Sequence, residues 1–185
     1  MDHYLEIQLL PDPEFSVLLL MNALFSKLHR ALVATSQGDI GVSFPHLSAQ
    51  QTGDVLRIHG QQTALQRLEQ LHWRQGLGEF TQVSGIKPVP AAGQHCLVSR
   101  VQTQSNADRL RRRAMKRQGC SYDKACQQIP NHVEQRLHLP SIQLKSHSTG
   151  QRFRLFIRQT PCEAMTSQLL FSKYGLSQAT TVPWF

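Results

Sequence analysis

Hydrophobic and polar positions follow two different periods at the start of the chain. Residues 3–10 alternate with a period of two, which is typical of a half-buried strand, and Pro11-Asp12-Pro13 ends this run. From residue 14 to residue 34 apolar side chains recur every three or four positions, which predicts an amphipathic helix. The apolar positions of this helix are Val17, Met21, Leu24, Leu28 and Leu32.

Shorter patterns continue the first half of the chain. Residues 40–44 and 55–59 read as strands, the leucines at 65, 68 and 71 indicate a second helix, and residues 80–86 indicate a fourth strand. The order βαββαβ is that of the ferredoxin-like fold, which many RNA-binding modules share. Fold alone does not assign function, and the aromatic segment of an RNA recognition motif is absent from these strands.

The second half begins after a stretch rich in proline and glycine, residues 87–93, that predicts a domain junction. We therefore predict an α+β protein with a ferredoxin-like domain over residues 1–90 and a second α+β domain over residues 91–185. The second domain begins with a strand over residues 96–102. Ser105 or Asn106 then caps a helix that carries the basic block of residues 109–117.

The basic block divides into two sides on a period of 3.6 residues. Leu110, Ala114 and Met115 form a narrow strip for docking onto the protein. The remaining side carries the positive charge and is expected to face phosphate. Its members are Arg109, Arg113 and Lys116, flanked by Arg112 and Arg117.

Charge separates the two halves of the chain. Residues 1–95 hold six Lys and Arg against eight Asp and Glu, a net charge of −2, whereas residues 96–185 hold fourteen against four, a net charge of +10. Such a local excess attracts a polyanion, and releasing counterions from phosphates drives binding. This favours RNA over an anionic membrane surface, because no lipidation motif accompanies the block. The alternative is a solvated helix face, but the block contains no Glu to neutralise its arginines.

Other classes of protein receive little support from the 185 residues. No run approaches the roughly 18 apolar residues of a membrane span, and the N-terminus lacks the basic start of a signal peptide, so we expect a cytoplasmic protein without a membrane partner. The four cysteines form no CxxC pair, and carboxylates in the second half are scattered. We therefore predict neither a metal site nor a cofactor.

Several segments, in this order and spacing, are highly specific together. They are Met1–Leu5, Lys27–His29, Gly41–Pro45, Ser99–Gln102, the basic block, Ser146–Gln151, Phe153–Ile157, Tyr174–Ser177 and Val182–Phe185. Over nearly its whole length the chain thereby resembles the CRISPR repeat-processing endoribonucleases of type I-F systems. The resemblance implies an arginine helix in the major groove of a repeat-RNA hairpin, a groove that must be opened near a loop or helix end. It also implies metal-free cleavage at the 3′ base of the stem by a ribose 2′-OH, leaving a 2′,3′-cyclic phosphate and a 5′-OH.

Catalytic roles follow from the same resemblance. His29 matches the catalytic histidine, and a neutral imidazole is a natural acceptor for the 2′-OH proton. Ser146 matches the serine that holds the reacting ribose, with Ser148 as an assistant, and Tyr174 matches a tyrosine that orients the histidine. Without the motifs, His29 would be read as a packed or solvated residue. His147 is a second imidazole that could replace His29 as the base or protonate the leaving oxygen, so the general acid stays unassigned.

RNA contacts are implied for three further residues. Phe153 corresponds to an aromatic that stacks on the terminal base pair, although it shares a face with Leu155 and could be a core residue. Arg100 and Gln102 correspond to residues that read a guanine and an adenine, but either could instead bind phosphate. At position 116 a lysine replaces the expected arginine, which keeps the charge and loses the fork of two donors.

The sequence thus predicts a metal-independent, sequence- and structure-selective endoribonuclease that cuts CRISPR precursor RNA. It would stay bound to the mature guide RNA and join the other subunits of the type I-F surveillance complex, because most contacts are to a hairpin that cleavage leaves intact. The alternative is a non-catalytic hairpin-binding subunit of a ribonucleoprotein complex. A DNA-binding regulator is a more distant third.

Overall fold

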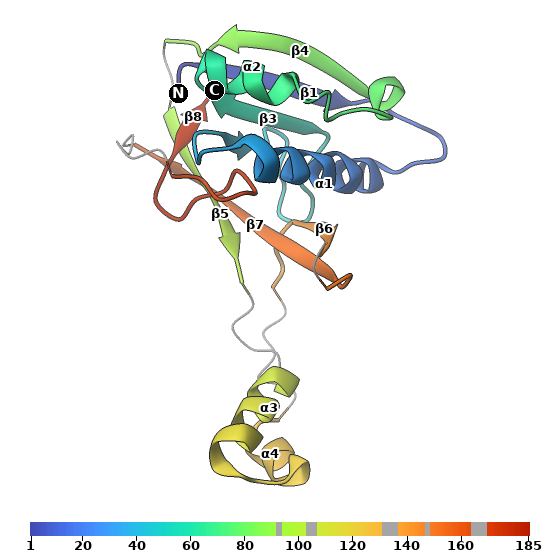
Figure 1. Ribbon diagram of the computed structural model, residues 1–185, viewed down its shortest axis with the longest axis vertical. Coiled ribbons are helices and arrows are strands. Elements are labelled where there is room, and N and C mark those ends of the chain that lie inside the picture. Colours follow the sequence, from blue (N-terminus) through green and yellow to red (C-terminus); the bar gives the residue numbers. More distant parts are fainter. Residues whose placement is uncertain (92–93, 103–106, 131–136, 147–148, 164–169) are drawn as a thin grey trace. The chain divides into compact units, whose positions relative to one another are not determined.

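The computed structural model describes the chain except for residues 92–93, 103–106, 131–136, 147–148 and 164–169. The described residues form two compact units. The first comprises residues 1–101 and 139–185, and the second comprises residues 102–138. The structure is a mixture of helices and antiparallel sheets, as predicted (Figure 1). The division at residue 90 inferred from the sequence stays a prediction.

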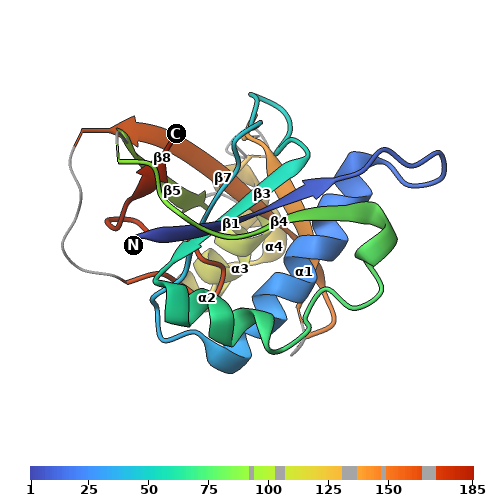
Figure 2. The same cartoon turned by 90° about the horizontal axis from the view of Figure 1, so that it is seen from above.

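The first sheet of the larger unit is built from the N-terminal strands. Its order is β2-β3-β1-β4, with every neighbouring pair antiparallel. Helices α1 and α2 both contact β1, and Figure 2 shows them on one side of this sheet. The elements are β1 (His3–Leu9), α1 (Val17–Thr35), β2 (Gly41–Ser43), β3 (Val55–Gly60), α2 (Gln62–Glu69) and β4 (Thr81–Pro88), with a 3₁₀ turn at Gly78–Phe80 before β4. The predicted order of strands and helices is therefore present.

Helix α1 begins three residues later than the periodicity predicts. Asp12 Oδ1 accepts hydrogen bonds from the backbone N–H groups of Glu14 and Phe15, at 2.9 and 2.8 Å, which holds these residues in a turn. Ser16 then caps the helix by accepting from the N–H of Leu19. Polar side chains before a helix thus decide where it starts.

The second sheet of the larger unit has the order β6-β7-β5-β8, again antiparallel throughout. Its strands are β5 (Gln94–Val101), β6 (Ser141–Lys145), β7 (Arg152–Cys162) and β8 (Val182–Trp184). Helix α1 contacts β1 of the first sheet and β6 of the second, and the N–H of Gln143 donates to Asn22 Oδ1 at 2.8 Å. Figure 1 shows α1 between the two sheets.

One hydrophobic core joins both sheets through α1. Its members include Leu5 and Ile7 of β1, Leu155 and Ile157 of β7, and the buried residues of α1, which are Leu20, Met21, Leu24, Phe25, Leu28, Ala31 and Leu32. By length and composition α1 could cross a membrane, since its mean hydropathy reaches 1.4. A helix packed in a protein core meets the same criterion, and the buried residues of α1 pack in this way, whereas Leu18, Leu19 and Val33 are exposed.

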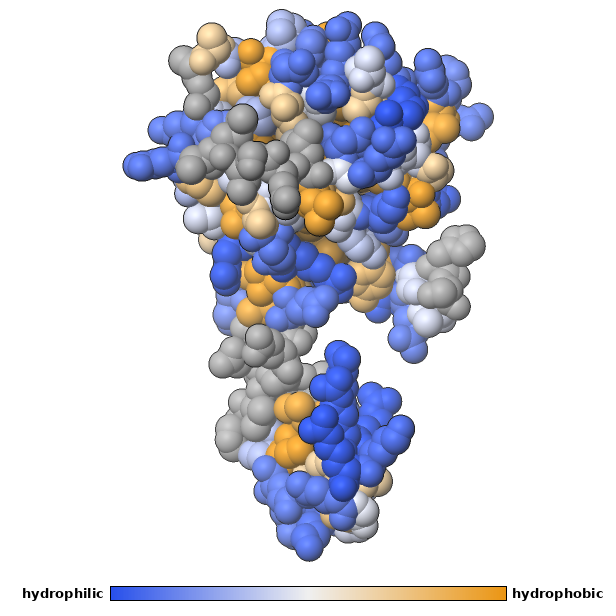
Figure 3. Space-filling model, turned by 60° about the vertical axis from the view of Figure 1, so that its left-hand side comes forward, coloured by the Kyte–Doolittle hydropathy of each residue, from blue (hydrophilic) through white to orange (hydrophobic). Residues whose placement is uncertain are grey.

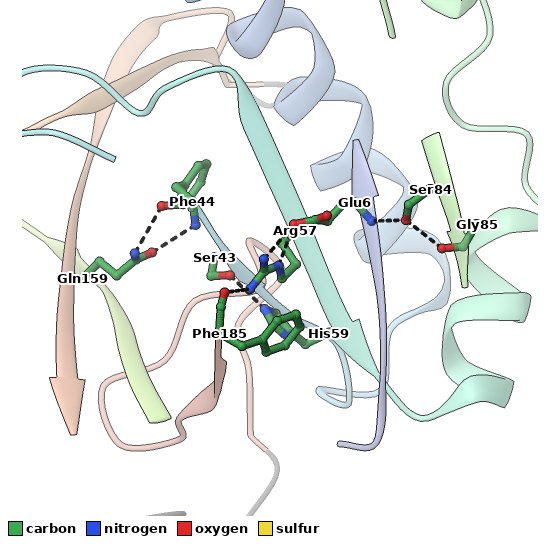
Figure 4. Close-up of polar contacts among 9 residues, drawn as sticks. All are labelled: Glu6, Ser43, Phe44, Arg57, His59, Ser84, Gly85, Gln159 and Phe185. Atoms are coloured by element: carbon green, nitrogen blue, oxygen red, sulfur yellow. Dashed lines mark hydrogen bonds and ion pairs between the residues drawn. The ribbon is translucent and has the colours of Figure 1, made fainter. Parts of the chain in front are cut away.

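Figure 4 shows Arg57 of β3 bonded both to Glu6 of β1 and to Phe185, which follows β8. Arg57, which is only 6% exposed, donates to Glu6 Oε1 from Nε at 2.8 Å and to the carbonyl oxygen of Phe185 at 2.7 Å. Its guanidinium also lies 3.9 Å from the centre of the Phe185 ring. A buried cation must be paired, and here its partners come from opposite ends of the chain. Arg57 thereby connects β8 to the first sheet.

His59, beside Arg57 on β3, is fully buried. Its Nε2 lies 2.8 Å from Ser43 Oγ on β2, and its Nδ1 has no hydrogen-bond partner among the described residues. Burial, reinforced by the positive charge of Arg57, lowers the pKa of His59 to about 3. This histidine is therefore a neutral structural residue.

Candidate active site

His29 is half-buried at the border of the packed side of α1, one turn after the buried Phe25. Its Nδ1 is 2.8 Å from the backbone carbonyl oxygen of Lys173. Because a carbonyl can only accept a hydrogen bond, Nδ1 carries the proton in the neutral ring. The lone pair is then on Nε2, which leaves Nε2 as the proton acceptor.

Tyr174 stacks against the His29 ring. The two rings are stacked, with centroids 4.2 Å apart and planes inclined by 11°. The turn that carries Tyr174 is held to β2, because the N–H of Val42 donates to the carbonyl of Gly175 at 3.0 Å. Gly175 has a φ of 69°, and a Cβ atom there would lie 2.8 Å from Val42 Cγ1. The motif Tyr174–Ser177 therefore needs its glycine for both conformation and space.

Ser146 follows the last residue of β6, where the chain turns toward β7. Its N–H donates to the carbonyl of Gln151, and its carbonyl accepts from the N–H of Gly150, at 2.8 and 2.9 Å. Its Oγ accepts from the N–H of Thr149 at 3.3 Å. The turn thus holds the Ser146 side chain at a defined place. Ser148 and His147 lie outside the described residues.

One cavity of about 970 Å³ brings these side chains together. It is lined by His29, Ser146, Phe153 and Tyr174, with Ser26, Arg30, Val33, Leu144, Lys145 and Gly150. None of the described lining residues is a carboxylate, whereas Arg30 and Lys145 are cations. The cavity therefore combines a proton acceptor and a hydroxyl with a surplus of positive charge, which suits an anionic ligand. Arg30 and Lys145 were not singled out in the sequence.

Phe153 lies between the core and the cavity. It is half-buried, packs against the hydrophobic core and stands opposite Leu144 in the β6–β7 register. The same ring also lines the cavity. Both interpretations of Phe153 from the sequence are thus compatible with its position, because one face of the ring can pack while its edge stays accessible.

Arg100 of β5 adjoins the same aromatic residues. Its guanidinium lies 5.9 Å from the ring centre of Phe153 and 5.9 Å from that of Tyr174. Its backbone carbonyl accepts a hydrogen bond from the Gln178 amide at 2.9 Å. Arg100 is therefore close to the cavity. Gln102 is exposed and belongs to the second unit.

The second unit contains the basic block on α3 (Ala107–Gln118), followed by α4 (Tyr122–Gln128). Hydrophilic residues form one face of this unit beside a smaller hydrophobic area (Figure 3). The exposed residues of α3 include all five cations assigned to RNA, namely Arg109, Arg112, Arg113, Lys116 and Arg117. Leu110, Ala114 and Met115, which were expected to form the docking strip, are half-buried. The helix thus has one packed side and one charged side.

Arg111 differs from the other arginines of the block. It is only 7% exposed, and its Nε donates to the carbonyl of Ile129 just beyond α4 at 2.9 Å. Its Nη1 lies 3.1 Å from Asp108 Oδ1, which also accepts from the Tyr122 hydroxyl at 3.3 Å. Arg111 therefore holds α3 to α4. A signal existed in the sequence, because on a 3.6-residue period Arg111 lies between Ala114 and Met115 on the apolar side.

The cavity combines a histidine whose Nδ1 is bound to a carbonyl, a hydroxyl and two cations, and the same chain carries a basic helix. This combination is typical of a protein that acts on a phosphodiester chain. The comparison with known families agrees with this class. A family model described as CRISPR-associated protein (Cas_Csy4) matches residues 4–185. The chain belongs to this family, so the resemblance inferred from its motifs is confirmed.

Two curated relatives match over their whole length. The chain is 49% identical over 185 residues to the CRISPR-associated endonuclease Cas6/Csy4 of Escherichia coli (strain UTI89 / UPEC). It is 47% identical over 187 residues to the CRISPR-associated endonuclease Cas6/Csy4 of Pseudomonas aeruginosa (strain UCBPP-PA14). In both cases the match covers 100% of each chain. The prediction that this protein is an enzyme of the endonuclease class is thereby confirmed.

Proposed function

We propose that this protein cleaves CRISPR precursor RNA at the 3′ base of the repeat hairpin, using the 2′-OH of the preceding ribose as the nucleophile. The observation that carries the proposal is the placement of His29. Its Nδ1 is bound to a carbonyl, and the ring lines a cavity together with Ser146. In this arrangement Nε2 of His29 takes the proton of the 2′-OH. The products are a 2′,3′-cyclic phosphate and a 5′-OH.

The remaining residues of the cavity position the RNA and compensate charge. Ser146 holds the reacting ribose, with Ser148 as an assistant, and Tyr174 keeps the His29 ring in plane. Phe153 stacks on the last base pair, which typically contributes about 1 to 3 kcal/mol per base. Arg30 and Lys145 offset the negative charge that develops on the phosphate.

Cleavage needs no metal ion in this proposal. Among the described residues, no three His, Cys, Asp or Glu side chains gather as ligands of a metal ion. The positive charges that a two-metal nuclease obtains from its ions come here from protein cations. The rate should therefore be insensitive to chelation of divalent metals.

Selectivity for the hairpin is assigned to both units. The five exposed cations of α3 bind the phosphates of the stem in its major groove, while Arg100 and Gln102 read a guanine and an adenine low in the stem. The strand order β2-β3-β1-β4 with α1 and α2 on one side supports assigning the N-terminal part to the ferredoxin-like fold. Because hairpin contacts survive cleavage, the protein retains the guide RNA and joins other subunits of a type I-F surveillance complex. We expect this to take place in the cytoplasm.

The experiment that tests the proposal uses purified protein and its own repeat hairpin RNA in EDTA. In parallel, the same RNA carries a single 2′-deoxy nucleotide upstream of the cut. Cleavage of the first RNA and not of the second is expected. Binding without cleavage of either RNA would contradict the proposal and favour a non-catalytic hairpin-binding subunit. His29→Ala should abolish cleavage and keep affinity, and a DNA hairpin of the same sequence should fail to compete.

A further inference from the structure

Lys173 contacts helix α1 at two points. Its backbone carbonyl accepts the hydrogen bond from His29 Nδ1 at 2.8 Å. Its ammonium group donates to the backbone carbonyl of Ser36 at 2.7 Å. Ser36 is the residue that caps the C-terminal end of the same helix, seven positions after His29, or about two turns. We propose that Lys173 is a positioning residue, whose bond to Ser36 sets the protonated nitrogen of His29.

The end of α1 offers Lys173 a suitable partner. Ser36 is 5% exposed, and a buried carbonyl needs a hydrogen-bond donor. The last turn of α1 contains no basic residue, so the ammonium group of Lys173 supplies the positive charge that a helix C-terminus favours. The bond to Ser36 therefore combines a charge-assisted hydrogen bond with an interaction with the helix dipole.

Lys173 lies in a turn in which the N–H of Gly175 donates to the carbonyl of Ser172 at 2.8 Å, and backbone bonds further out hold the segment at both ends. The N–H of Phe171 donates to the carbonyl of Gly38, and the carbonyl of Gly175 accepts from the N–H of Val42, each at 3.0 Å. Lys173 lies between these two anchors and is itself exposed. Within this segment the turn from Ser172 to Gly175 sets the local shape, and the side-chain bond of Lys173 to Ser36 ties that turn, with its carbonyl, to the end of α1. This bond is the contact that a substitution can remove.

The position of this carbonyl determines which ring nitrogen of His29 is the base. A neutral imidazole without a partner prefers to carry its proton on Nε2. The Lys173 carbonyl reverses this preference by accepting a hydrogen bond from Nδ1. The stacked Tyr174 ring holds the plane but makes no contact that distinguishes the two nitrogens. Lys173 thus acts on the reaction through His29 without contacting RNA, an inference that rests on the proposed role of His29 as the base.

Three variants test Lys173. Lys173→Met keeps the length of the side chain and removes the donor, whereas Lys173→Arg restores a donor. Lys27→Met is the matched control. Lys27 is a residue of α1 whose ammonium group, like that of Lys173, donates to a backbone carbonyl, that of Gln75 at 2.7 Å, and it does not line the cavity. The ¹⁵N spectrum of the His29 ring, assigned with His29→Ala, is recorded without RNA. Single-turnover cleavage and affinity for the 2′-deoxy RNA are measured alongside.

We expect Lys173→Met to slow cleavage by about tenfold to a hundredfold, the effect of misplacing a reacting group, with the affinity for 2′-deoxy RNA unchanged. The His29 ring signals should move toward a protonated Nε2 in this variant, and Lys173→Arg and Lys27→Met should resemble the wild type. A Lys173→Met protein with wild-type His29 signals would overturn the inference, whatever its rate. Failure of the wild-type protein to cleave would instead refute the proposed function. The two failures can be told apart because the ring spectrum is recorded without RNA.

Discussion

The contrast between Arg113 and Arg111 gives a sharp test of the basic helix. Both residues belong to α3, but Arg113 is exposed whereas Arg111 is 7% exposed and bonded to Ile129. If the exposed side binds phosphate, each cation contributes about 0.9 to the slope of log affinity against log salt, taking the value for duplex DNA. Five exposed cations then give a slope of about −4.5, which Arg113→Ala reduces to about −3.6.

These slopes translate into measurable affinities. Between about 50 mM and 200 mM salt, the wild-type protein should lose roughly 500-fold in affinity for the hairpin and Arg113→Ala roughly 150-fold. Filter binding with 2′-deoxy RNA over a series of salt concentrations measures both values. An Arg113→Ala protein with the wild-type slope would refute the assignment of the exposed side to phosphate.

Arg111→Ala should behave differently. Its loss leaves the carbonyl of Ile129 and the carboxylate of Asp108 without this donor, so the packing of α3 on α4 should weaken. Hydrogen exchange of the α3 amides in the free protein should therefore accelerate in Arg111→Ala and stay unchanged in Arg113→Ala. Equal exchange rates in the two variants would contradict the structural role of Arg111.

Three further predictions concern the larger unit. The free energy of unfolding should fall as pH drops from about 6.5 toward 3, because His59 binds a proton in the unfolded chain but not in the native protein, where its pKa is about 3. Urea titrations at several pH values measure this slope, to which His59 contributes up to about 1.4 kcal/mol per pH unit. The slope should be smaller in His59→Asn. Gly175→Ala should destabilise the protein by about 1 kcal/mol or more in the same titration, and should slow cleavage by moving Tyr174. Phe153→Ala should reduce cleavage more than Phe153→Leu, and equal rates would favour a purely structural side chain.

The sequence predicts elements whose side chains repeat a clear period. The strand at β1 and the long helix α1 were predicted because alternation and the three- to four-residue spacing extend over enough positions. Helix α4 and strands β6 and β8 were missed. Helix α4 has seven residues and β8 three, too few to display a period, so neighbouring elements determine their conformation. Strand β6 does alternate over its five residues, and this short pattern was overlooked.

Contacts between distant parts of the chain account for the features of the site that no local pattern reveals. Arg57 meets Phe185 across 128 positions, and His29 meets Lys173 across 144. The second contact uses a backbone carbonyl, a group that every residue possesses, so no residue type at position 173 could indicate it. The motifs identified His29, Ser146 and Tyr174 as candidates, but only the fold shows that their side chains line one cavity.

The same contacts explain how the half-buried His29 can have a fixed orientation. His29 is anchored by its own helix α1, by a stacked ring beside it and by a carbonyl at Nδ1, and the ring and the carbonyl come from one turn far along the sequence. The turn that supplies the ring and the carbonyl is bound to β2 through Val42 and to the end of α1 through Ser36. Because β2 and α1 share one core, loosening that core should reduce the cleavage rate before it unfolds the protein. Catalysis by this site would thus depend on packing several residues away from the RNA.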